Sequence, residues 1–357
     1  MSLIPVTVLT GFLGAGKTTL LQQVLAEPAF ARTAVVINEF GEIGLDGALV
    51  VGGPEQLVAM TSGCLCCTIR GDIRSTLVDL LRRRAAGEVP PFERIVVETT
   101  GLADPAPVIH TLMADPSLAG AYALGGVVTL VDAVHGADTL ERHGESVKQV
   151  AVADRLVLTK AELARDPASR RELGELRTTL RHLNPAAPIL ERHDSALCCE
   201  ALFDTALYDP LSKSLDVRRW LAAEALEGEH GGHHRHHHHD INRHGSDIEA
   251  FCLTLETPME PLRFSVALEL LAGHRGDDLL RVKGIVALSD DPDRPLVVHG
   301  VQHIFHRPVR LQAWPDADHR TRLVFITRGI RRETILDYLA AWGRDEAAGW
   351  RPLPASG

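Results

Sequence analysis

The sequence predicts an α/β fold, with a mostly parallel sheet covered by helices and a smaller α+β C-terminal domain. Two observations predict it. Up to about residue 205, short continuous apolar runs alternate with segments of helical length, as in parallel sheets that are buried on both faces. After that point the alternation stops, and a polar, low-complexity stretch precedes a second ordered region.

The composition is that of a globular protein. The chain has 357 residues, which suggests two domains, with 45% hydrophobic and 24% charged residues. Its formal net charge of −10 argues against a general affinity for nucleic acid or an anionic membrane. The N-terminal stretch lacks the basic region of a signal peptide, and no apolar run is long enough to span a bilayer. We therefore expect a soluble cytoplasmic protein.

The first domain is expected over residues 1–205. Apolar runs of strand length and segments with helical spacing alternate along it. Strands are expected at 4–10, 34–38, 94–98, 126–133 and 155–159, and helices at 17–26, 72–84, 106–114, 140–151 and 169–182.

The remainder of the chain divides into a linker, a second domain and a tail. The linker is expected over 206–247, because 224–247 is polar and without periodicity. The second domain is expected over 248–345, and the tail, over 346–357, has no pattern. Within the second domain we expect strands at 251–255, 279–288, 296–301, 304–313 and 322–327, and helices at 262–272 and 331–342.

A phosphate-binding loop is predicted at residues 11–18, GFLGAGKT, between the first strand and the first helix. The pattern G-x-x-x-x-G-K-[ST] in this context places backbone N–H groups and a helix N-terminus around phosphate oxygens. Lys17 is expected to reach the β- and γ-phosphates, and the Thr18 hydroxyl to bind Mg²⁺. The expected nucleotide-binding residues of this loop are Gly11, Gly14, Ala15, Gly16, Lys17, Thr18 and Thr19.

A nucleoside triphosphatase also needs a carboxylate near Mg²⁺ and a group that senses the γ-phosphate. The strand in IVVETTG, at 95–101, ends in Glu98, and Gly101 follows. We expect Glu98 to act on the metal and its water shell, and the Gly101 amide to contact the γ-phosphate. Lys17, Thr18 and Glu98 are thus the predicted catalytic residues.

A motif for the nucleotide base is predicted at 155–162, RLVLTKAE, where a strand runs into Thr159, Lys160 and Glu162. In such a motif the carboxylate accepts hydrogen bonds from guanine, and the lysine stem packs on the base. Glu162 is one methylene longer than the aspartate usual at this place. The motif therefore favours guanine without assuring strict selectivity.

Three of the six cysteines, Cys64, Cys66 and Cys67, lie within GCLCC at 63–67. In a reducing compartment, such crowding favours metal binding or redox chemistry over structural disulfides. Thiolates suit Zn²⁺, with Co²⁺ as an alternative. We predict a metal site with a fourth ligand from a carboxylate, a histidine or a partner; a redox pair or buried thiols are the alternatives.

An acidic, glycine-broken stretch, NEFGEIGLDG at 38–47, lies between the second strand and these cysteines. It is predicted to be a loop that responds to the nucleotide. Glu39 and Glu42 are its candidate ligands for Mg²⁺ or the thiol-bound metal. The alternative is that both are ordinary solvated acids.

With GFLGAGKT, NEFGE, GCLCC, ETTG and TKxE in this order, the chain resembles the CobW-type metallochaperone GTPases. The resemblance covers essentially the whole chain and includes RVKG at 281–284 in the second domain. It implies GTP hydrolysis coupled to the handling of zinc or cobalt. It implies phosphate and Mg²⁺ roles for Lys17 and Thr18, and a Walker B role for Glu98. It also implies guanine contacts for Thr159 and Lys160 and metal binding by the three cysteines, whereas Glu162 departs from the family's usual aspartate.

A histidine-rich segment, HGGHHRHHHHD, occupies 230–240. Neutral imidazoles ligate borderline metal ions, so we predict a weak, rapidly exchanging collector of metal that feeds or buffers the thiol site. The alternative is a polar linker of biased composition. The candidate ligands are His233, His234, His236, His237, His238 and His239.

These motifs predict a GTP-hydrolysing metal chaperone that binds zinc, or cobalt, and delivers it to a client metalloprotein. The expected ligands are GTP, Mg²⁺ and Zn²⁺, with Co²⁺ as the alternative ion. The sequence leaves the oligomeric state open, with a homodimer as one alternative. One rival is cobalt delivery for cobalamin synthesis or for a cobalt enzyme. A rival of another class is a histidine-rich storage or buffering protein with a vestigial nucleotide site. A P-loop kinase is disfavoured, because the sequence shows no acceptor site.

Overall fold

The computed structural model describes residues 3–38, 56–59, 65–69, 72–192, 202–203, 247–306, 308–340 and 350–352. The chain divides into two compact units, and each unit holds one sheet. Among the helices described, none combines the length and the apolar character that crossing a bilayer requires.

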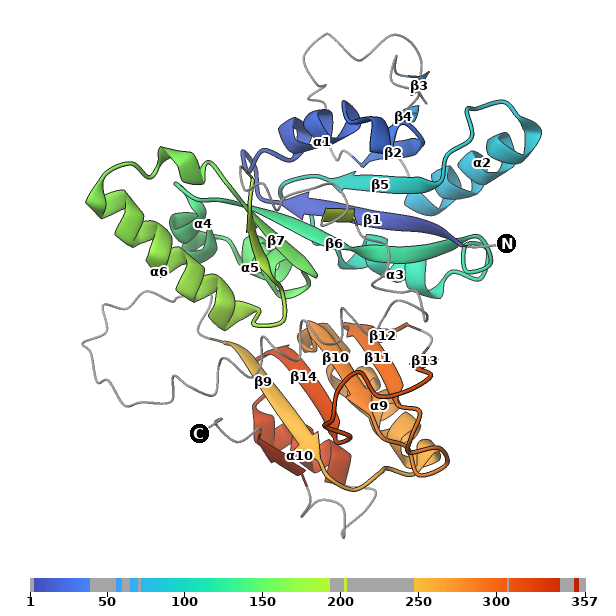
Figure 1. Ribbon diagram of the computed structural model, residues 1–357, viewed down its shortest axis with the longest axis vertical. Helices are drawn as coiled ribbons and strands as arrows, with labels where there is room; N and C mark the ends of the chain where they lie inside the picture. Colours follow the sequence, from blue (N-terminus) through green and yellow to red (C-terminus); the bar gives the residue numbers. More distant parts are fainter. Residues whose placement is uncertain are drawn as a thin grey trace. The chain divides into compact units, whose positions relative to one another are not determined.

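The first sheet has eight strands in the order β3-β4-β2-β5-β1-β6-β7-β8 (Figure 1). All neighbouring pairs are parallel except β3 with β4, which is antiparallel. The strands are β1 (Ile4–Gly11), β2 (Thr33–Asn38), β3 (Gln56–Ala59), β4 (Leu65–Ile69), β5 (Arg94–Thr99), β6 (Tyr122–Asp132), β7 (Arg155–Thr159) and β8 (Ile189–Glu191).

Helices connect these strands. They are α1 (Lys17–Leu25), α2 (Ile73–Ala86), α3 (Ala106–Ala114), α4 (Gly136–Arg142), α5 (Gly144–Ala151) and α6 (Pro167–Leu183), with short 3₁₀ turns at Pro28–Phe30 and Ala161–Leu163. Right-handed crossovers in opposite directions along the sheet put α1 on one face and α3 on the other. The apolar side of α1 packs on alternate residues of the central strands, including Leu9, Val96 and Leu130.

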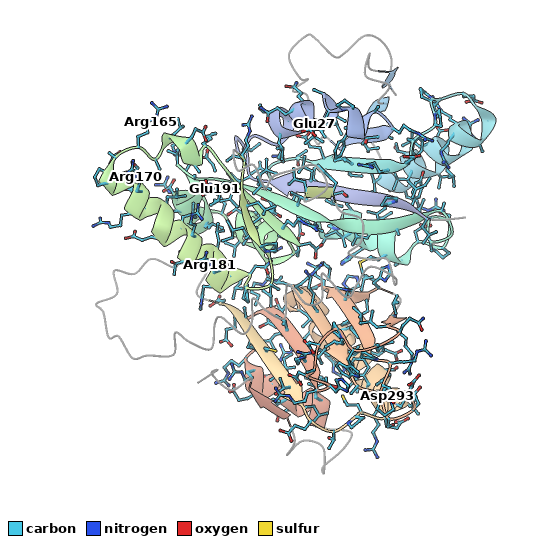
Figure 2. The ribbon with its side chains drawn as sticks, viewed as in Figure 1. Glu27, Arg165, Arg170, Arg181, Glu191 and Asp293 are labelled. Atoms are coloured by element: carbon cyan, nitrogen blue, oxygen red, sulfur yellow. The ribbon has the colours of Figure 1, made fainter. Side chains whose placement is uncertain are left out.

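Helix α6 illustrates how the sequence pattern orients a surface helix. Its buried residues are Leu176, Leu180 and Leu183, at spacings of four and three. Arg170 and Arg181 lie on its exposed side (Figure 2).

The second sheet is antiparallel, in the order β12-β11-β10-β14-β9-β15, with β13 paired to β11. Its strands are β9 (Ile248–Leu255), β10 (Arg281–Val286), β11 (Leu296–Val301), β12 (Ile304–Phe305), β13 (Val309–Arg310), β14 (Thr321–Arg328) and β15 (Trp350–Pro352). Two helices accompany it, α9 (Pro261–Arg275) and α10 (Arg332–Ala340), together with a 3₁₀ turn at Gly276–Asp278.

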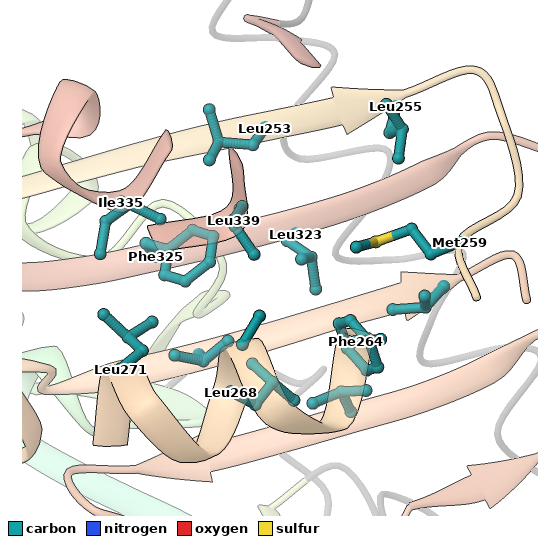
Figure 3. Close-up of a cluster of buried hydrophobic side chains, with 14 of the residues drawn as sticks. Leu253, Leu255, Met259, Phe264, Leu268, Leu271, Leu323, Phe325, Ile335 and Leu339 are labelled. Atoms are coloured by element: carbon teal, nitrogen blue, oxygen red, sulfur yellow. The ribbon is translucent and has the colours of Figure 1, made fainter. Parts of the chain in front are cut away.

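The core of this unit lies between its sheet and its two helices. Phe264 and Leu268 of α9 and Ile335 of α10 meet Leu323 and Phe325 of β14 there (Figure 3). Helix α9 begins where Glu260 caps it, accepting hydrogen bonds from two backbone N–H groups at 3.0 and 2.9 Å.

Two expectations about elements were wrong. The helix expected at 140–151 is two helices, α4 and α5, separated by His143, whose backbone is extended; Gly144, a residue that weakens helices, follows it. The strand expected at 304–313 is two short strands, β12 and β13, on either side of Pro308, which has no N–H to donate to a sheet. Within the tail, whose sequence shows no pattern, the short strand β15 pairs with β9.

Candidate functional site

The phosphate loop follows β1 and ends at α1, as the sequence predicts. Gly14 and Gly16 have φ values of 76° and 88°, which side chains other than glycine rarely adopt. Gly11 has a φ of 139°, and a Cβ there would lie 2.4 Å from the carbonyl oxygen of Leu130 on β6. The backbone conformation of the loop, and the close approach of its first residue to β6, therefore depend on these glycines.

Lys17 is the first residue of α1, and its side chain is buried. Its Nζ donates to the carbonyl oxygens of Gly11 and Phe12, at 2.7 and 3.2 Å. Burial lowers the pKa of Lys17 below the usual lysine value, and the negative charge of Glu98 partly opposes that shift. The ammonium is thus held at the loop, where phosphate would bind.

The predicted magnesium residues are in contact. The Thr18 hydroxyl donates a 2.8 Å hydrogen bond to Oε1 of Glu98, which is buried on β5. The next residue, Thr99, donates to the hydroxyl of Thr10 on β1, also at 2.8 Å. Strands β1 and β5 are parallel neighbours, so the Thr10–Thr99 contact joins their carboxyl ends. The Thr18–Glu98 contact joins the end of β5 to the first turn of α1.

Gly101 packs directly against the phosphate loop. A Cβ at this position would lie 2.5 Å from the backbone nitrogen of Leu13. Gly101 is itself buried, whereas Leu13 is exposed. The turn after β5 therefore approaches the phosphate loop more closely than any larger residue permits.

The base motif lies at the end of β7. The Thr159 hydroxyl donates to the carbonyl oxygens of Ala15, at 2.9 Å, and Val131, at 3.3 Å, and so ties this motif to the phosphate loop. Lys160 has a left-handed backbone conformation with a φ of 61°, and Glu162 is exposed in the following 3₁₀ turn. These three predicted residues thus lie at the same edge of the sheet as the loop.

One residue of this edge was missed by sequence reasoning. Asp132 ends β6, and its Oδ2 lies 2.6 Å from the Lys160 Nζ. Its Oδ1 accepts hydrogen bonds from the backbone nitrogens of Val134, at 2.8 Å, and His135, at 3.3 Å. The available signal was a carboxylate at the end of an apolar strand next to the motif-bearing strand, the same signal that identified Glu98.

The cysteine motif is only partly within the described residues. Cys66 and Cys67 are consecutive residues of β4, and their backbones pair with Val35 and Val36 of β2. Strand β2 in turn neighbours β5, where Ile37 pairs with Glu98. The cysteine strand is thus two strands away from the strand of the predicted magnesium ligand.

Several predicted metal ligands lie outside the described residues. They are Cys64, Glu39, Glu42 and the histidines His233, His234, His236, His237, His238 and His239. Within the residues that the structure does describe, no three His, Cys, Asp or Glu side chains come close enough to hold a metal ion. The predicted thiol and histidine sites therefore stay predictions.

Phosphate, magnesium and base motifs gathered at the carboxyl edge of a parallel sheet are the arrangement of the P-loop GTPases, and this protein is one of them. Residues 5–191 match the nucleotide-binding domain of the CobW/HypB/UreG family, and residues 248–342 match the cobalamin synthesis protein cobW C-terminal domain. The chain belongs to this family.

Known proteins resemble the chain over nearly its whole length. The zinc chaperone YjiA of Escherichia coli is 33% identical over 339 residues, covering 94% of this chain and 97% of that protein. The zinc chaperone CobW of Pseudomonas aeruginosa is 31% identical, with 94% and 90% covered. The crystal structure of zinc-bound YjiA GTPase from E. coli superposes with a TM-score of 0.71 at 31% identity, over 96% of this chain and 99% of that one. The predicted family and fold class are confirmed.

Proposed function

We propose that this GTPase is a zinc chaperone, which binds zinc at Cys64, Cys66 and Cys67 and delivers it to a client metalloprotein. The observation that carries the proposal is the position of β4. This strand bears two of the three cysteines and lies in the same sheet as the phosphate loop and Glu98. Only one strand, β2, separates β4 from β5, so a conformational change at the nucleotide can reach the thiols through neighbouring strands of one sheet.

In this proposal the nucleotide is GTP. Lys17 and the backbone of Gly11, Gly14, Ala15 and Gly16, with Thr19, hold the phosphates. The Gly101 amide contacts the γ-phosphate, and Thr159, Lys160 and Glu162 bind the base.

The residues present fit Mg²⁺. The Thr18 hydroxyl and the Glu98 carboxylate are hard oxygen donors, and they already lie 2.8 Å apart. When bound, Mg²⁺ neutralises charge that develops on the phosphates during transfer. Helix α1 holds Thr18 and strand β5 holds Glu98 in place for the metal, and hydrogen bonds to the loop carbonyl groups keep the Lys17 ammonium beside the phosphates.

Zinc is the cargo. Its assignment is supported by the thiol set, which suits a borderline ion, and by the names of the relatives YjiA and CobW, both zinc chaperones. Three thiol ligands with one open position suit transfer better than permanent storage. Cobalt delivery, for cobalamin synthesis or for a cobalt enzyme, is the alternative within the same class, since ligand type separates the two ions poorly.

GTP binding would order the acidic segment that carries Glu39 and Glu42, and would bring the thiols into metal-binding geometry. Hydrolysis would release the segment and the ion. The support is the chain order, because this segment connects β2 to the antiparallel pair β3–β4. A ligand shifts such an equilibrium only by its differential affinity for the two states, so the nucleotide must contact the segment in one state only.

The histidine-rich segment would collect and buffer zinc for the thiol site.

Four apolar side chains lie at the carboxyl edge of the first sheet, where the nucleotide is proposed to bind, and are between 51% and 60% exposed: Leu13, Leu102, Val134 and Leu163. Exposed apolar side chains at the ends of neighbouring strands support binding of a protein partner at this edge, and the partner proposed is the client. The homodimer, the lack of nucleic-acid and membrane partners, the cytoplasmic setting and the division at 205, 247 and 345 also stay predictions.

A chelator-competition titration tests the proposal. Protein lacking residues 230–240 is titrated with Zn²⁺ and Co²⁺, with Mg²⁺ and a non-hydrolysable GTP analogue or without nucleotide. We expect tight binding of Zn²⁺ only with nucleotide, and its loss in Cys66→Ser. Tighter binding of Co²⁺ would favour the cobalt alternative. Equal, weak affinity in both states would refute the chaperone mechanism and favour storage by the histidine-rich segment.

A further inference from the structure

The ion pair between Lys160 and Asp132 is built into two neighbouring strand ends. Asp132 is the last residue of β6, and its backbone pairs in parallel register with Thr159, the last residue of β7. Lys160 follows, and its Nζ lies 2.6 Å from Oδ2 of Asp132. The two side chains therefore meet because the strand register brings them together.

Both oxygens of the Asp132 carboxylate are engaged. Oδ1 accepts from the backbone nitrogens of Val134 and His135, while Oδ2 accepts from Lys160. The carboxylate is largely buried, with 10% of its side chain exposed. A carboxylate held by two backbone donors has little freedom to rotate, so it presents Oδ2 in a fixed direction.

Lys160 is constrained from both ends. Its backbone has a φ of 61°, a conformation that residues other than glycine adopt at a cost. Its ammonium is anchored by Asp132. A lysine stem of four methylenes is otherwise among the most mobile side chains, and ordering it on binding carries a large entropic cost.

We propose that Asp132 is a positioning residue for the nucleotide base: it holds the Lys160 ammonium so that the lysine stem is ordered as a platform before the base arrives. Asp132 itself touches no nucleotide in this proposal. The inference rests on the proposed role of Thr159, Lys160 and Glu162 as the base motif. It adds a residue that the motif does not contain.

The test is a double-mutant cycle on GDP affinity, measured with a fluorescent GDP in the presence of Mg²⁺. Asp132→Asn keeps an oxygen for Val134 and His135 but removes the charge that anchors Lys160. Lys160→Met keeps an apolar stem but has no ammonium. We expect each single variant to weaken GDP binding about tenfold, and the double variant to be no weaker than Lys160→Met alone.

A control variant separates positioning from a general structural role. Asp154→Asn is the matched control, because Asp154 is also a buried carboxylate that accepts from a backbone nitrogen, that of Val127 at 2.9 Å, beside the same two strands. We expect it to leave GDP affinity unchanged. If Asp132→Asn does not fold, Asp132→Ser supplies a hydroxyl acceptor for the same turn and enters the same cycle.

The outcomes also separate this inference from the proposed base motif. A wild-type protein that binds ADP as tightly as GDP would overturn the base motif, and the inference with it. A wild-type protein that prefers GDP, with Asp132→Asn either harmless or fully additive with Lys160→Met, would overturn the positioning role alone.

Discussion

The hydroxyl of Thr18, in the first turn of α1, donates a 2.8 Å hydrogen bond to the carboxylate of Glu98 on β5. The two residues are 80 positions apart in the chain. They meet because β1, which leads into the phosphate loop, is the parallel neighbour of β5, with Leu9 paired to Glu98. The two oxygen ligands proposed for Mg²⁺ are thereby brought together by the sheet, and little reorganisation is needed when the metal binds.

Glu98→Gln should separate metal-dependent catalysis from nucleotide binding. The amide oxygen still accepts from Thr18, but the negative charge that favours Mg²⁺ is gone. We expect GTP hydrolysis to fall about 100-fold or more, while GDP affinity measured without Mg²⁺ changes little. Steady-state phosphate release and GDP titrations with and without Mg²⁺ check this. Hydrolysis at the wild-type rate would remove Glu98 from the catalytic set.

Gly101→Ala should displace the phosphate loop, although residue 101 is not part of that loop. The new Cβ would be 2.5 Å from the Leu13 nitrogen, so the loop or the turn must move. We expect a loss of about 1–3 kcal/mol in the free energy of unfolding and weaker GTP binding. The matched control is Gly120→Ala, where the added Cβ meets no atom within 4 Å, and where denaturant unfolding should show a change within about 0.5 kcal/mol. Equal effects of the two substitutions would contradict the close approach.

Thr159→Val should uncouple the base motif from the phosphate loop. Valine has the shape of threonine but no hydroxyl to donate to Ala15 and Val131, whose carbonyl oxygens would lose a buried donor. The expected cost in unfolding free energy is about 1–3 kcal/mol, accompanied by weaker GDP binding. Thr159→Ser keeps the hydroxyl and should restore most of the affinity. If serine and valine behave alike in GDP titrations, the hydroxyl bridge has no role in binding.

Nucleotide affinity should depend on alkaline pH through Lys17. Burial lowers the pKa of this lysine in the nucleotide-free protein, and only its charged form attracts phosphate. As pH rises, the ammonium is therefore lost earlier than in an exposed lysine, and GDP affinity should fall. In Lys17→Arg the guanidinium keeps its charge, so affinity, although lower, should fall less steeply. Ionisation of the guanine base affects both proteins equally, so identical alkaline slopes would count against this role of Lys17.

The architecture of the first sheet could be predicted from the sequence because its strands are continuous apolar runs. Runs such as 4–10 and 94–98 are buried on both faces of a parallel sheet, and the structure has strands there. β3, β4 and β8 were missed, because they have only four, five and three residues and no distinct apolar pattern. Strand order depends on pairing between segments far apart in the chain, which no local pattern contains.

In the candidate site, too, the local motifs could be predicted from the sequence, whereas the contacts between distant residues could not. The loop at Gly11–Thr18, Glu98 and the motif at Thr159 were found because each has a local signature at a strand end. The contacts between them were not predictable. The Thr159 hydroxyl reaches Ala15 across 144 positions, and Lys160 meets Asp132 through the register of β6 and β7. Such contacts depend on tertiary packing, and for this reason Asp132 was missed.

The central claim is that GTP and zinc bind cooperatively, and its most direct test is reciprocity. If nucleotide strengthens zinc binding, zinc must strengthen nucleotide binding by the same factor. The affinity for a non-hydrolysable GTP analogue is measured with and without saturating Zn²⁺, in protein lacking residues 230–240, with Cys66→Ser as control. We predict that Zn²⁺ tightens nucleotide binding by about 5- to 150-fold, the usual range of such coupling, and that the control loses the effect. Nucleotide affinity unchanged by Zn²⁺ would contradict the account.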